Sequence, residues 1–122
     1  MSSLVGVGID LVDVDRFTLT ITRRPALITR FFTEREVSES AGRPERLAAR
    51  FAAKEAVLKV LGVGLGATAL RNIEVCRAES GAPSLHLTGT AATLAEERSI
   101  RRWQLSMTHT NHSAGAVALG LS

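Results

Sequence analysis

The chain has 122 residues, of which 45% are hydrophobic and 22% charged, a composition typical of a globular domain. No apolar run approaches the roughly 20 residues that a membrane-spanning helix needs. Cys76 is the only cysteine, which excludes a disulfide framework. We therefore expect one domain over residues 1–122, located in the cytoplasm and without a membrane partner. A chain of this length buries only a modest core, so we expect no deep active-site cleft within one copy.

The formal net charge is +3, but the basic residues are unevenly distributed. Residues 16–59 contain ten of the fifteen lysines and arginines against five acids, an excess that would attract an anionic ligand or partner. A solvated helical face explains the same excess, so charge alone does not decide between a binding surface and a face that only keeps the protein in solution. Aromatic residues make up 4% of the chain and tyrosine is absent. This argues against a base-stacking surface, and we expect no nucleic-acid partner.

Residues 4–12 alternate as a β-strand does, with Val5, Val7 and Ile9 on one face and two glycines and Asp10 on the other. The glycines leave the strand bare of side chains next to Asp10. Two explanations are open: a bulky group approaches the backbone there, or the glycines allow close packing within the protein.

Local signals then predict three helices. Asp13 is a candidate N-cap for a helix over residues 14–22. The run Thr33-Glu34-Arg35-Glu36 matches a capping box, in which the glutamate binds back to the cap amide, so we assign Glu36 a structural role. The longest helix is expected to start at Pro44 and to stop at Gly62, because proline suits a first turn and glycine suits a C-terminus.

Glu55 projects, within that longest helix, between an apolar face and a stripe of alanines, so we expect its side chain to be largely buried. A buried carboxylate is costly unless a partner or a cation compensates its charge. Lys59, one turn later, would form an ion pair with it. The other interpretation is a divalent metal held by Glu55 and Asp10 that handles a phosphate.

The second half of the chain predicts strands at residues 72–77 and 84–88, a helix at 90–100, and strands at 104–110 and 114–121. No repeat or linker divides these elements, so we draw no domain boundary.

Several familiar sites are excluded by spacing. Gly6-x-Gly8 and Gly62-x-Gly64-x-Gly66 do not match the glycine motifs of nucleotide-binding loops. Cys76 alternates within a strand and has no local helix N-terminus to activate its thiol. His109 closes a strand, where ligand-contacting side chains often gather, and is the better candidate.

Three blocks of the chain together resemble the 4′-phosphopantetheinyl transferase superfamily, and most of all its small bacterial holo-acyl-carrier-protein synthases. The blocks are Gly6–Asp10 with Arg16 and Phe17, Arg50–Ala56 with Lys59, and Ser106–Thr110. The resemblance implies an α+β fold, with an antiparallel sheet packed against helices, and a homotrimer with active sites between subunits. It also implies Mg²⁺-dependent transfer of phosphopantetheine from coenzyme A to a serine of apo acyl carrier protein. The products are holo acyl carrier protein and adenosine 3′,5′-bisphosphate, in support of fatty acid or polyketide biosynthesis.

The same resemblance implies roles for individual residues. Asp10 and Glu55 match the metal ligands and, with Lys59, form the catalytic set; either Glu55 or a metal-bound water would accept the serine proton. Residues that match coenzyme A contacts are Arg50, Lys59, Gly62, His109 and Thr110. Arg16 matches a family residue that contacts the carrier protein. Arg23 and Arg24 are assigned to the same contact only because they lie in the same segment. Val12 stands where larger members often have a further acid, which favours the small type.

The alternative from another class is a basic interaction module without chemistry. It would bind an acidic protein or a nucleic-acid backbone, with Glu55 held only by Lys59 and Lys54. Such a module needs no divalent metal and has no affinity for coenzyme A.

Overall fold

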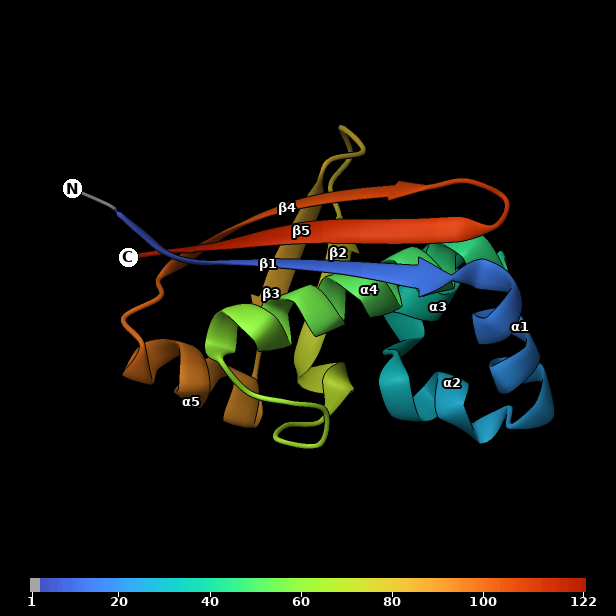
Figure 1. Ribbon diagram of the computed structural model, residues 1–122, viewed down its shortest axis with the longest axis horizontal. Helices are drawn as coiled ribbons and strands as arrows, with labels where there is room; N and C mark the ends of the chain where they lie inside the picture. The colour runs from blue at the N-terminus through green and yellow to red at the C-terminus, as the bar shows by residue number, and fades with distance from the viewer. Residues whose placement is uncertain (1–2) are drawn as a thin grey trace.

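A three-stranded antiparallel sheet and the long helix α4 packed against it organise the fold (Figure 1). The structure is a computed structural model and describes residues 3–122. In chain order the elements are β1 (Leu4–Asp13), α1 (Val14–Arg23), α2 (Ala26–Phe31), α3 (Glu34–Ser40), α4 (Pro44–Leu61), the 3-10 helix η1 (Leu70–Asn72), β2 (Ile73–Arg77), β3 (Pro83–Leu87), α5 (Gly89–Glu97), β4 (Arg102–His109) and β5 (Ser113–Leu121). The large sheet has the order β1-β5-β4, and β2 pairs with β3 in a second antiparallel sheet. The expected α+β fold with antiparallel sheets is confirmed.

The helix ends follow the sequence signals closely. Asp13 caps α1 by accepting the amide of Arg16 at 2.9 Å. Thr33 and Glu36 form the expected capping box of α3. Gly62 ends α4 with a φ of 72°, a left-handed conformation that favours glycine. None of the helices in residues 3–122 combines the length and apolar character that crossing a membrane requires.

Two short elements were not predicted, α2 and η1. They contain six and three residues, too few for a hydrophobic period to stand out. Pro25 is the N-cap residue of α2. α2 matters for the site because Phe31, at its end, contacts the ring of Phe51 on α4, with centroids 5.5 Å apart.

The glycines of β1 serve packing within the protein, which decides between the two explanations left open by the sequence. A Cβ at Gly8 would overlap the carbonyl oxygen of Ala56, so the α4 backbone lies directly against the strand. A Cβ at Gly6 would lie 3.3 Å from the side chain of Val60. Ala52 and Ala56 are fully buried, as expected for a small-residue stripe at a close helix contact.

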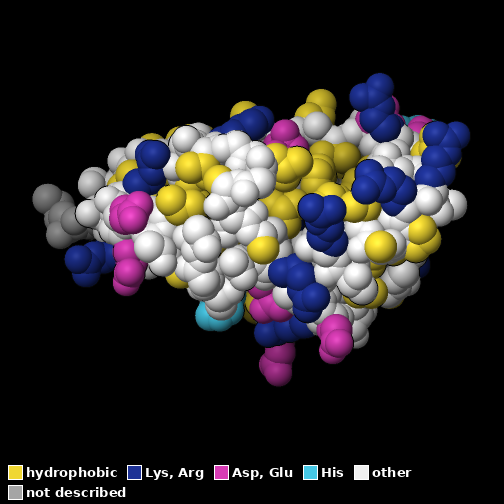
Figure 2. Space-filling model, turned by 90° about the horizontal axis from the view of Figure 1, so that it is seen from below, with side chains coloured by type: hydrophobic (Ala, Val, Ile, Leu, Met, Phe, Trp, Pro, Cys, Tyr) yellow, Lys and Arg dark blue, Asp and Glu magenta, His cyan; other side chains and the backbone are white. Residues whose placement is uncertain are grey.

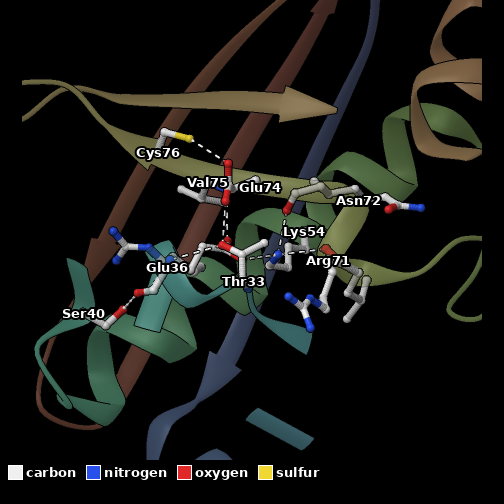
Figure 3. Close-up of polar contacts among 12 residues, drawn as sticks. Thr33, Glu36, Ser40, Lys54, Arg71, Asn72, Glu74, Val75 and Cys76 are labelled. Atoms are coloured by element: carbon white, nitrogen blue, oxygen red, sulfur yellow. Dashed lines mark hydrogen bonds and ion pairs between the residues drawn. The ribbon is translucent and has the colours of Figure 1, made fainter. Parts of the chain in front are cut away.

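Lys54 and Glu36 form a fully buried ion pair behind α4, with Nζ and Oε1 2.8 Å apart (Figure 3). Lys54 Nζ also donates to the carbonyls of Leu70 at 2.8 Å and Ile73 at 2.6 Å, so all three of its protons have acceptors. Glu36 in turn accepts the amide of Val75 at 3.0 Å. Burial lowers the pKa of Lys54, and the Glu36 carboxylate opposes that shift. The pair joins α3, α4, η1 and β2, and so fixes the rotation of α4 about its axis.

Replacing Gly8 by alanine should destabilise the protein by about 3 kcal/mol, because the added methyl overlaps backbone that cannot move aside locally. Urea unfolding at one fixed protein concentration measures the change. Gly64→Ala is the matched control, since a Cβ there meets nothing within 4 Å. Equal midpoints for the two variants would contradict the packing argument.

Lys54→Met should cost roughly 3–5 kcal/mol of unfolding free energy, because it leaves the Glu36 carboxylate buried without its cation. Lys59→Met, on the same helix, should cost less than about 1 kcal/mol, since Lys59 is 54% exposed and its ion pair is solvated. Thermal or urea unfolding of both variants tests the contrast. Similar losses for the two lysines would refute it.

Candidate functional site

Asp10 and Glu55 lie together where α4 crosses β1, with Lys59 beside them. Lys59 Nζ donates to the carbonyl of Ile9 at 2.7 Å and to Asp10 Oδ1 at 3.3 Å. These bonds tie the exposed lysine to the strand, one turn along the helix from Glu55. The ion pair between Glu55 and Lys59, one of the two interpretations that the sequence left open, is not formed: among residues 3–122, Lys59 pairs with Asp10 and Lys54 with Glu36. Neither lysine holds Glu55 in the way that the interaction-module alternative requires.

Glu55 is half-buried, so the expectation of a largely buried carboxylate was wrong in degree. Its side chain faces an open hollow and is not enclosed between helix and sheet. Burial raises its pKa most, the nearby negative charge of Asp10 raises it further, and Lys59 partly opposes both. A cation bound between the two acids would stabilise the ionised form of Glu55.

These two acids line a hollow of about 490 Å³, which we call the carboxylate hollow. Its other walls are mostly apolar, including Phe17, Phe31 and Phe51, and Asp13, Arg16 and Thr20 line it as well. Within residues 3–122 no group of three or more His, Cys, Asp or Glu side chains converges on a metal position. Two carboxylates nevertheless fit Mg²⁺, which binds oxygen, retains waters and takes its remaining ligands from a substrate's phosphates.

His109 and Arg50 lie elsewhere, in a second hollow of about 400 Å³ that we call the arginine hollow. Arg46 and Arg77 line it with them, and it shares no lining residue with the carboxylate hollow. Arg50 is only 1% exposed, and its Nε has no hydrogen-bond partner among the described residues. A buried guanidinium with an unused donor beside two further arginines is suited to an anion.

Gly62 and Thr110, also predicted as ligand contacts, lie outside both hollows. At Gly62 the Arg98 guanidinium lies against the bare Cα, so that a Cβ there would be 2.6 Å from Nη2. Thr110 supports the β4–β5 turn, where its Oγ1 accepts the amides of His112 at 3.2 Å and Ser113 at 3.0 Å. Their predicted contacts with a ligand stay predictions.

The three arginines expected at the carrier protein lie along α1 and at its end. Arg16 lines the carboxylate hollow, and Arg24 lines a third hollow of about 810 Å³ together with Arg30. Phe31 and Phe51 border both hollows, which therefore adjoin. Arg23 is exposed and lines neither. Figure 2 shows this face: hydrophobic side chains gather in its recess, with basic side chains around them on the side of α1 and α2.

Arg46 and Arg77 are site residues that the sequence analysis did not single out. Arg46 precedes Arg50 by one helical turn, so the pair shares a face of α4, and that spacing was a usable signal. Arg77 gave no signal, because its position at the hollow depends on how β2 lies against α4.

Comparison with known proteins shows the family. The family model of the 4′-phosphopantetheinyl transferase superfamily matches residues 6–117. A holo-[acyl-carrier-protein] synthase of Frankia alni is 49% identical over 119 residues, covering 98% of this chain and 95% of the relative.

Solved structures of similar proteins have the same fold. The acyl carrier protein synthase of Mycobacterium tuberculosis matches with a TM-score of 0.74 and 35% identity, covering 98% of each chain. The holo-[acyl-carrier-protein] synthase of Helicobacter pylori in complex with coenzyme A matches with a TM-score of 0.85 and 26% identity, covering 94% of this chain and 99% of that one. The chain therefore belongs to the holo-[acyl-carrier-protein] synthases of the 4′-phosphopantetheinyl transferase superfamily.

Proposed function

We propose that the protein transfers 4′-phosphopantetheine from coenzyme A to a serine of apo acyl carrier protein. The observation that carries the proposal is the pair of charged hollows that α4 lines, one through Arg46 and Arg50 and the other through Glu55. Coenzyme A carries its phosphates in two groups, a diphosphate and a 3′-phosphate. A carboxylate site suited to a metal–diphosphate complex and an arginine site suited to a lone phosphate match these groups. Similar proteins solved with coenzyme A support the choice of donor.

At the carboxylate hollow, Asp10 and Glu55 would hold Mg²⁺. When bound, the ion neutralises the diphosphate and stabilises the charge of the departing phosphate. The serine oxygen forms a bond to the phosphorus of the phosphopantetheine arm, and the bond to the second phosphate breaks. Adenosine 3′,5′-bisphosphate leaves, and holo acyl carrier protein is the other product.

The residues around the reacting groups supply position, charge and a proton acceptor. Lys59, fixed on the carbonyl of Ile9, places a positive charge next to the acids and is exposed enough to reach a phosphate. The raised pKa of Glu55 makes its carboxylate a better base near neutral pH than an ordinary glutamate. Of the two acceptors considered, we therefore favour Glu55: one oxygen would hold the metal and the other would take the serine proton.

The two hollows would combine across neighbouring copies, in a homotrimer. Val5, Val7, Ile9 and Leu11 on the outer face of β1 are 42%, 54%, 64% and 78% exposed. They form an apolar row along an unpartnered face of the sheet, and such a row marks an interface. A second copy packed on this row would bring its arginine hollow toward the first copy's carboxylate hollow.

The carrier protein would dock along α1 and α2. Arg16, Arg23, Arg24 and Arg30 are exposed there, next to apolar recesses. Basic side chains that surround an apolar recess suit an acidic partner with a hydrophobic contact. We propose a carrier of fatty acid or polyketide biosynthesis as that partner.

Incubation with apo acyl carrier protein, coenzyme A and Mg²⁺ should add one phosphopantetheine to the carrier, detected by mass spectrometry, and a chelator should prevent it. Asp10→Asn and Glu55→Gln should each lower the rate by at least about 100-fold, because the metal contributes several kcal/mol. Asp15→Asn, a solvent-exposed acid on α1, is the control and should retain the rate. No increment with any of several carriers would favour the interaction module.

A shared site predicts complementation between inactive variants. Mixed oligomers of Glu55→Gln with an Arg77→Glu/His109→Ala double variant should transfer faster than the sum of the two alone. The reason is that some sites then combine an intact carboxylate hollow with an intact arginine hollow. Glu55→Gln mixed with Asp10→Asn is the matched control, since both lesions lie in one hollow. Recovery in neither mixture would place each site within a single copy.

A further inference from the structure

Glu39 lies behind the arginine hollow and contacts two of the arginines that line it. Its Oε1 accepts Nη2 of Arg50 at 3.3 Å and the backbone amide of Arg77 at 3.2 Å. Its Oε2 accepts Nε of Arg35 at 3.1 Å. Glu39 itself does not line the hollow. One carboxylate thus accepts hydrogen bonds from the side chain of one arginine that lines the hollow and from the main chain of another.

Arg50 depends on this contact because its guanidinium is buried and stays charged. Glu39 is the acid that pairs with it among the described residues, and the bond leaves the other side of the guanidinium free toward the hollow. A planar group held at one edge presents its remaining donors in a fixed direction. Without that restraint, Arg50 would lose its orientation and its compensating charge together.

Arg77 ends β2, and the hydrogen bond that its backbone N–H donates to Glu39 attaches that strand end to α3. The Arg77 side chain then enters the hollow from the strand while Arg50 enters from α4. Burial disfavours the charge of Glu39, but the hydrogen bonds from Arg35, Arg50 and the Arg77 amide, together with the charge of Arg35, hold its pKa below the ordinary value. Glu39 is therefore ionised at neutral pH and can act as a permanent acceptor.

We propose that Glu39 is a positioning residue, which orients Arg50 and Arg77 so that both bind one phosphate group without Glu39 touching it. Under the proposed function, on which this step rests, that group is the 3′-phosphate of coenzyme A. The contrary view is that Glu39 competes with the phosphate for Arg50. The two views predict opposite signs: removing a positioning acid weakens phosphate binding, whereas removing a competitor strengthens it.

The test measures, by calorimetry on the intact protein, binding of adenosine 3′,5′-bisphosphate and of adenosine 5′-monophosphate, which lacks the 3′-phosphate. Glu39→Leu should weaken bisphosphate binding about tenfold and monophosphate binding less than about twofold, because only the bisphosphate uses the oriented arginines. Glu39→Asp, which keeps the charge but withdraws the oxygens, should weaken the bisphosphate similarly. Glu39→Gln should stay within about threefold of wild type, since its amide oxygen can accept from Arg50 and Arg77.

Glu34→Leu is the matched control, since it removes an exposed acid from the same helix, and it should change neither affinity. Unfolding curves show whether each variant is folded; if Glu39→Leu is not, Glu39→Asp carries the test. Tighter bisphosphate binding by Glu39→Gln, or equal weakening for both nucleotides, would overturn the proposal.

A wild-type protein that does not distinguish the nucleotides would also overturn it. Selective, Glu39-dependent bisphosphate binding without any carrier modification would instead refute the proposed transfer and leave the positioning role intact.

Discussion

The close approach of α4 to β1 is the constraint on which the rest of the molecule depends. It requires a residue without a side chain at Gly8, because the carbonyl of Ala56 fills the space where a Cβ would stand. Glu55 immediately precedes Ala56 on the helix, and Asp10 follows Gly8 by two residues and so lies on the same strand face. The contact that packs the core therefore also brings the two acids together. The favourable packing of the two backbones, rather than any bond between the acids, offsets the electrostatic repulsion between their carboxylates.

Helix α4 extends this constraint to the second hollow. Arg50 and Lys59 are nine residues apart, which corresponds to about 13.5 Å along a helix. The buried Lys54–Glu36 pair holds the rotation of this rod, so the acids and Lys59 face β1 while Arg46 and Arg50 face β4 and the β2–β3 hairpin. A displacement of α4 would alter both hollows at once. We therefore regard the ion pair as part of the architecture of the site, although it touches neither hollow.

The sequence predicted what local signals determine. Caps at Asp13, Thr33 and Gly62 set the helix ends, and the alternation of residues 4–12 identified the strand and the face that carries Asp10. Partners that depend on packing could not be foreseen. Helix spacing allowed an ion pair between Lys59 and Glu55, but β1 offers Lys59 a carbonyl and a carboxylate that no helix periodicity reveals. The division of the family-matched residues between two hollows likewise depends on where β2 and β4 lie.

That division has a physical explanation in the size of the chain. In a domain of 122 residues, one helix–sheet core occupies most of the interior. The described structure places the charged groups of the two hollows on separate surfaces. Neither hollow alone meets the whole charge of coenzyme A. The apolar row on β1 leaves hydrophobic surface exposed to water in the isolated chain, which is unfavourable, and association would bury that surface. Under the proposed function, joining two copies through this row would serve stability and catalysis together, because the exposed apolar row adjoins the acids that a second copy's arginines would complement.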